Sequence, residues 1–141
     1  MAEPQTTLSP LLCSEARATD EDSMPISIDI RQELNGRADI QDALDALTLL
    51  ARRQLRRRAL PRLYESGVRY QREARRPRER WQTPMETLRR GVGDCEDLGT
   101  WRAAEVGGRA FPVRAGRGWH ILVWRPDGRI EDPSRVLGMG Q

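Results

Sequence analysis

Residues 93 to 133 read GDCEDLGTWRAAEVGGRAFPVRAGRGWHILVWRPDGRIEDP, and this stretch decides the fold class. Asp94 is a typical N-cap residue, and the apolar residues after it recur at helical spacing until Gly107 and Gly108 end the pattern. Beyond Gly108 the hydrophobic period changes to two, which predicts strands at residues 109–115, 119–125 and 129–132. Helices followed by strands indicate an α+β fold.

Two further helices are predicted before this stretch. Apolar residues recur at helical spacing from Asp39 to about Leu60, and Pro61 should end that helix. The segment Thr83-Pro84-Met85-Glu86 has the pattern of a capping box with proline at the first helical position. We therefore expect a short helix that runs through Leu88.

The N-terminal part of the chain is less regular. Residues 1–23 are polar and show no periodicity, so we expect a disordered tail there. Isoleucines alternate with polar residues at 26–30, which predicts a short strand. At 141 residues in total, the rest of the chain, residues 24–141, should form one domain.

Composition excludes several classes of protein. All 24 basic residues are arginine, so no lysine can form a Schiff base. No apolar run approaches the ~18 residues of a membrane span. The N-terminus lacks the basic-then-apolar layout of a signal peptide, which leaves the cytoplasm as the expected compartment and no membrane partner. We expect no disulfide, because Cys13 lies in the predicted tail.

Basic charge alone does not indicate nucleic-acid binding here. The net charge is +3, and the arginine run at residues 52–58 has no stacking aromatic nearby. We interpret this run as the solvated end of a helix, with an acidic protein partner as the alternative. Two cysteines and one histidine, widely spaced, do not make a zinc site.

Cys95 is the candidate nucleophile. It follows the predicted N-cap, where free amides favour a thiolate by roughly 0.3–1 kcal/mol. Three neighbouring carboxyl groups oppose that effect, so the helix end alone cannot activate the thiol. An imidazolium about 4 Å away would contribute up to ~4 kcal/mol. The chain has one histidine, His120, which is the only candidate for that partner, with a structural histidine in an apolar strand as the alternative.

The turn after His120 decides whether a carboxylate can orient it. A two-residue Asp127-Gly128 loop would place Asp132 on the strand face away from His120. A three-residue loop, with Gly128 as a left-handed bulge, pairs residue 129 with residue 125 and places both side chains on one face. Pro126 favours the three-residue loop, because its fixed φ suits a type I turn and forbids type I′.

These residues carry a resemblance. The blocks at 93–98, 101–105, 119–120 and 130–133 (GDCEDL, WRAAE, WH and IEDP) resemble the transglutaminase-like superfamily, and most closely its small bacterial and phage-type members. The likeness covers about residues 60 to 139, and the order Cys, His, Asp is the order of that family. It implies a papain-type fold, with N-terminal helices packed on a small antiparallel sheet.

The resemblance also implies roles. Cys95 would be the nucleophile, His120 the general base and acid, and Asp132 the group that orients His120. Trp81 or Gln82 would stabilise the oxyanion, although Trp81 could equally be a core residue. No cofactor or metal is implied. The expected substrate is a peptide or protein amide bond, and we favour hydrolysis over acyl transfer because so small a chain has little surface for two protein substrates.

The alternative from the same resemblance is a non-catalytic, phage-related structural or interaction module. Either version could be cytoplasmic or associated with a virion.

One departure from the family is a glycine-rich helix, with Gly99 in its middle, which should lower helix stability by roughly 1 kcal/mol. Trp101, Trp119 and Trp124 are expected in the core, since each alternates with polar neighbours.

Overall fold

The computed structural model describes residues 28–30, 36–72 and 79–141. The predicted tail at residues 1–23, with Cys13, and residues 26–27 of the first predicted strand lie outside the described residues. The elements in chain order are β1 (Ile28–Ile30), α2 (Arg37–Arg57), η1 (Leu63–Glu65), β2 (Arg69–Tyr70), β3 (Glu79–Trp81), α3 (Pro84–Arg90), β4 (Val92–Gly93), α4 (Cys95–Val106), β5 (Arg109–Ala115), β6 (Gly118–Trp124), β7 (Ile130–Glu131) and α5 (Pro133–Val136). The described part is thus a mixed helix and strand structure, as expected.

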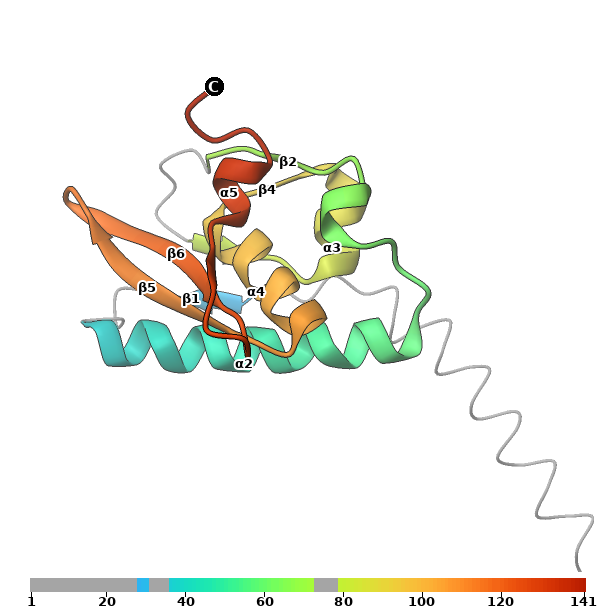
Figure 1. The fold of residues 1–141 in the computed structure, drawn as a ribbon, viewed down its shortest axis with the longest axis horizontal. Coiled ribbons are helices and arrows are strands. Elements are labelled where there is room, and N and C mark those ends of the chain that lie inside the picture. Colours follow the sequence, from blue (N-terminus) through green and yellow to red (C-terminus); the bar gives the residue numbers. More distant parts are fainter. Residues whose placement is uncertain (1–27, 31–35, 73–78) are drawn as a thin grey trace, which may run out of the picture.

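Helix α4 is the central element of the fold. It contacts α2 on one side and β6 on another, and α2 in turn contacts β5. Figure 1 shows α2 along one side of the molecule, with the long β5–β6 hairpin and α4 beside it. The packed side chains at these contacts are buried and apolar, and include Leu44, Leu47, Ala103, Ile121 and Val123. Leu98 and Trp101 of α4 belong to a second buried cluster, with Leu63 and Val68. Each such side chain contributes roughly 1.5–3 kcal/mol when it leaves water.

Gly99 explains how closely α4 lies against β6. A Cβ atom at this position would meet Cγ2 of Ile121 at 2.7 Å, which is too close for any side chain. The glycine in the middle of the helix therefore has a packing role, because it lets the helix axis approach the strand. Its lower helix propensity is the cost of that approach.

The ends of the helices agree with the sequence in part. Asp94 begins α4 with a capping box: its carboxylate accepts the Asp97 amide, and the Asp97 carboxylate accepts the Asp94 amide. The predicted capping box at residues 83–86 is wrong, because Thr83 makes no cap hydrogen bond with its side chain and is buried instead. Helix α2 ends at Arg57, before the predicted Leu60, since Arg58 is already extended.

Three small sheets are present among the described residues. The predicted antiparallel sheet is confirmed as β5-β6-β7. Strands β1 and β3 form an antiparallel pair, and β2 and β4 form a parallel pair. Pro112 fits within β5 because it faces Ile121 at a position where neither residue bonds to the other across the ladder, so its missing N–H breaks no bond.

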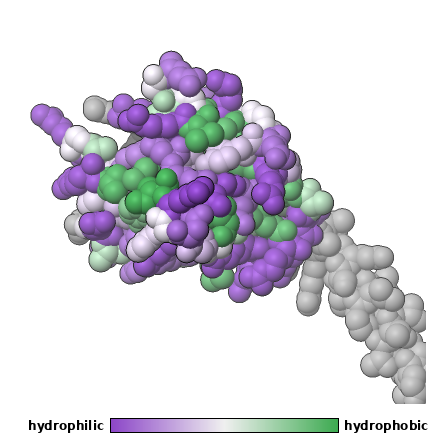
Figure 2. Space-filling view, in the orientation of Figure 1, coloured by the Kyte–Doolittle hydropathy of each residue, from purple (hydrophilic) through white to green (hydrophobic). Residues whose placement is uncertain are grey.

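The tryptophans correct one prediction about the core. Trp101 is fully buried and Trp119 is half-buried, but Trp124 is 57% exposed. Trp124 lies at the end of β6 on the strand face opposite Val123, and α4 covers only the Val123 face. Figure 2 shows a mostly hydrophilic surface with a few separate apolar patches. None of the helices in the described ranges has the length and apolar character needed to span a bilayer.

Candidate active site

The β6–β7 turn sets the position of Asp132. The Arg125 amide donates to the Arg129 carbonyl at 2.8 Å, and the Gly128 amide donates to the Arg125 carbonyl at 3.0 Å. Gly128 has φ +87°, the left-handed conformation of the bulge residue. The ladder pairs Val123 with Glu131, so the predicted three-residue loop and its register are confirmed.

With this register His120 and Asp132 meet. Nε2 of His120 lies 2.9 Å from Oδ2 of Asp132, and both side chains are about four-fifths buried. The second oxygen of Asp132 accepts the amide of Arg135 at 3.3 Å and caps α5. The carboxylate is therefore fixed from two sides. Arg135 also reaches Oδ2 at 3.5 Å through a largely exposed guanidinium.

Cys95 occupies the first position of α4 and carries a free, half-buried thiol. It packs beside the core cluster that contains Ile121, and the Ile121 backbone makes a hydrogen bond to the thiol that lowers its pKa. Ile121, whose backbone N–H bonds to the Cys95 sulfur, directly follows His120 in the sequence.

The surroundings of the thiol oppose its ionisation. Burial raises the pKa of Cys95 most, and the Glu96 and Asp94 carboxyl groups raise it further. Burial also raises the pKa of Asp94 to about 9, with the Glu96 charge as the next cause. Near neutral pH both Cys95 and Asp94 are therefore protonated in the absence of a bound partner.

Asp97, two residues after Cys95, accepts several hydrogen bonds from neighbouring residues. Its two carboxylate oxygens accept the Gln82 backbone amide at 2.6 Å and the Gln82 side-chain amide at 2.7 Å. Burial raises the pKa of Asp97, while these N–H donors lower it. The side-chain oxygen of Gln82, Oε1, accepts a hydrogen bond from Nη1 of Arg90 at 3.0 Å, so both ends of the Gln82 side-chain amide are hydrogen-bonded.

Trp81 differs from Gln82 in having an unused donor. Its side chain is 2% exposed and packs in the same core cluster as Cys95. The indole Nε1 has no hydrogen-bond partner among the described residues. A buried N–H without a partner is costly, so Trp81 has a donor left for one further hydrogen bond.

Two neighbours of the site were not predicted. The Tyr70 pKa is raised by burial and then by the charges of Cys95 and Asp94, which places the phenol near the thiol. Tyr70 arrives through the parallel β2–β4 pairing, which two-residue strands do not signal in sequence. Glu131 forms an ion pair with Arg102. In the sequence, the only sign of a role for Glu131 is its position directly before Asp132.

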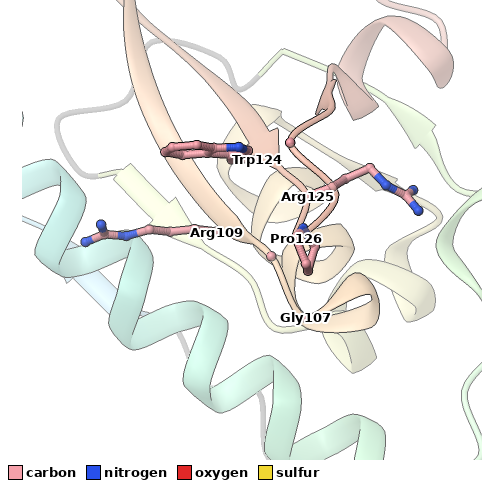
Figure 3. Close-up of a pocket in the computed structure, with 7 residues that line it drawn as sticks. Gly107, Arg109, Trp124, Arg125 and Pro126 are labelled. Atoms are coloured by element: carbon pink, nitrogen blue, oxygen red, sulfur yellow. The ribbon is translucent and has the colours of Figure 1, made fainter.

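A shallow pocket lies elsewhere on the sheet. Figure 3 shows it between the start of β5 and the end of β6, where Arg109 and Trp124 face each other across the ladder. Trp124 is four residues beyond His120 along the strand, or about 13 Å. None of Cys95, His120 and Asp132 lines this pocket.

Comparison with known proteins adds no relative. The chain matches no protein-family model, no curated protein and no solved structure.

Proposed function

We propose that the chain is a cysteine-nucleophile enzyme that cleaves an amide or peptide bond through a thioester. The observation that carries the proposal is the 2.9 Å contact between His120 and Asp132, beside the strand position whose amide meets Cys95. A carboxylate that holds one ring nitrogen of a histidine orients the other nitrogen toward a nucleophile. The finer fold assignment, a papain-type, transglutaminase-like domain, belongs to the same proposal.

The contact also specifies the histidine tautomer. Asp132 accepts a hydrogen bond, so the neutral ring carries its proton on Nε2 and leaves Nδ1 free to accept one. Nδ1 is therefore the nitrogen that would take the Cys95 proton. Because burial and acids raise the thiol pKa, transfer to Nδ1 should accompany attack on the carbonyl rather than precede it.

The proposed reaction has two halves. The Cys95 sulfur bonds to the carbonyl carbon as its proton moves to His120, and the carbonyl electron pair moves to oxygen, toward the unused Trp81 N–H. When the intermediate collapses, the C–N bond breaks and the amine leaves with the His120 proton. Water then attacks the thioester, gives a proton to His120, and the thiol is released. We favour hydrolysis over acyl transfer and place the reaction in the cytoplasm or a virion.

Alkylation of the thiol tests this function. In a Cys13→Ser background, iodoacetamide should modify Cys95 at a rate that falls about tenfold or more in His120→Ala, because the base is lost. Asp132→Asn should also slow the reaction. Asp127→Asn is the control, since it removes a carboxyl group from the same hairpin without touching His120. A rate and pH profile that are unchanged in His120→Ala would refute the proposed function.

A second candidate is the non-catalytic interaction module. The acidic surroundings of Cys95 favour it, since two carboxyl groups and burial all raise the thiol pKa. This reading predicts that Cys95 reacts as an ordinary buried thiol with no dependence on His120. The same alkylation series therefore separates the two functions.

A further inference from the structure

Glu131 is the last residue of β7, directly before Asp132, and its carboxylate binds two arginines. Arg102 of α4 binds it with both ends of the guanidinium, Nε to Oε2 at 2.7 Å and Nη2 to Oε1 at 3.0 Å. Arg125 of the same hairpin adds a third bond, Nη1 to Oε1 at 2.9 Å. Side-chain hydrogen bonds from Arg102 are the main cause of the lowered pKa of Glu131.

Arg102 is itself held in place. Its side chain is 11% exposed, its Nη1 donates to Glu105 at 3.3 Å, and its guanidinium stacks over the Tyr64 ring at 4.4 Å. Glu105 in turn accepts the amide of Leu63 at 2.8 Å. The stacking on Tyr64 and the bond to Glu105 fix the plane of the Arg102 guanidinium, so its Nε–H and Nη2–H groups point in one direction.

Strand β7 is held by its pairing with β6 and by the side-chain contacts of Glu131, which also include the Tyr64 hydroxyl at 3.5 Å. It is two residues long, and its first residue, Ile130, is 61% exposed. The Arg102–Glu131 pair is thus the direct side-chain link between β7 and α4. That same helix carries Cys95 at its first position, so one ion pair connects the helix of the thiol with the strand residue directly before Asp132.

We propose that Arg102 and Glu131 are positioning residues for Asp132. Their bidentate pair holds the end of β7 against α4, and because Asp132 directly follows Glu131, it fixes the backbone that directs the Asp132 carboxylate to Nε2 of His120. The geometric part of this inference is independent of catalysis. Its consequence for reactivity rests on the proposed function.

The chain offers a direct reporter and a matched control. His120 is the only histidine, so the long-range proton–nitrogen correlations of its ring show which nitrogen carries the proton. Arg109 and Asp45 form a second bidentate pair, with bonds of 3.1 and 2.7 Å, between α2 and β5. Arg109→Met removes this second bidentate arginine–carboxylate pair and changes no contact of β7.

The experiment compares ¹⁵N-labelled wild-type protein with Arg102→Met, Arg102→Lys and Arg109→Met. Wild type and Arg109→Met should show the Nε2–H tautomer, Arg102→Met a mixture of tautomers, and Arg102→Lys an intermediate state, since an ammonium cannot form the fork. Cys95 alkylation should slow about tenfold in Arg102→Met if the proposed function holds. Circular dichroism checks that each variant folds. If Arg102→Met does not fold, Glu131→Gln takes its place, because it keeps the shape of the side chain.

The outcomes are separable. A folded Arg102→Met or Glu131→Gln protein that keeps the wild-type tautomer overturns the positioning role, and so does a wild-type ring without the Nε2–H tautomer. Alkylation that is independent of His120 in the wild type refutes the proposed function. In that case a tautomer shift in Arg102→Met would still support the positioning role.

Discussion

At the scale of single residues, Gly99 shows how the site depends on one missing side chain. Substituting Gly99→Ala adds about 1 kcal/mol of helix propensity but places a methyl group 2.7 Å from Cγ2 of Ile121. We expect a net loss of up to about 2 kcal/mol in the free energy of unfolding, because overpacking costs about 1–3 kcal/mol.

Urea unfolding measures this change, and Gly99→Ala/Ile121→Leu supplies its control. Leucine has no methyl group at the colliding position, so the double variant should recover part of the lost stability. A more stable Gly99→Ala protein would show that α4 does not need this close approach.

Glu96 is predicted to hold the Cys95 thiol protonated. After burial, its charge is the largest cause of the raised thiol pKa, so Glu96→Gln should lower the pH midpoint of alkylation by about one unit. Glu65→Gln makes the same change in net charge at an exposed residue and should leave the midpoint in place. Equal midpoints in Glu96→Gln and wild type would contradict this electrostatic role.

Sequence reasoning selected Cys95, His120 and Asp132 as candidates from local rules. A helix cap places Cys95, the single histidine limits the choice of base, and a proline turn sets the face of Asp132. It did not reach Tyr70, because a two-residue parallel pair brings it in. It could not foresee the unused indole N–H of Trp81, since that depends on tertiary packing.

At the scale of elements, the β6–β7 turn controls which face of β7 meets His120. Deleting Arg129 would keep the three-residue loop and pair Ile130 with Arg125, so the register shifts by one residue and Asp132 moves opposite Val123, on the other face. We expect the His120 ring to lose its preference for the Nε2–H tautomer. Gly128→Ala keeps the loop length and only strains the left-handed residue by about 1 kcal/mol, so it should keep the register. An unchanged tautomer in the deletion variant would contradict the register argument.

Elements with strong periodicity or clear end signals were predictable. The helix after Asp94 and the strand at 109–115 were located to within a residue, because a cap and a double glycine bound them. The short elements were not, and α5 is an example: four residues after Asp132 carry no periodicity. Thr83 misled the prediction since a buried threonine and a capping threonine look alike in sequence.

At the scale of the whole molecule, the buried acids should make stability depend on pH. In the folded protein the pKa of Asp94 is raised to about 9, whereas the unfolded chain releases this proton near pH 4. The folded state therefore binds more protons than the unfolded state between these values, and stability falls as pH rises through this window.

Urea unfolding at pH 5, 7 and 9 tests this dependence. Asp94→Asn keeps an N-cap acceptor and removes the ionisation, so its stability should fall less over the same range. Parallel curves for Asp94→Asn and wild type would show that Asp94 is ionised in the folded protein.

The uninterrupted run from α4 to β7 has a consequence for how the chain folds. Helix α4 and strands β5, β6 and β7 follow one another and pack on their neighbours, so closing these contacts costs little loop entropy. The contact of α2 with β5 joins residues as far apart as Gln41 and Ala110. Because contacts between near neighbours in sequence form faster, we expect the contacts of His120 with Asp132 and of Cys95 with Ile121 to form before the long helix docks.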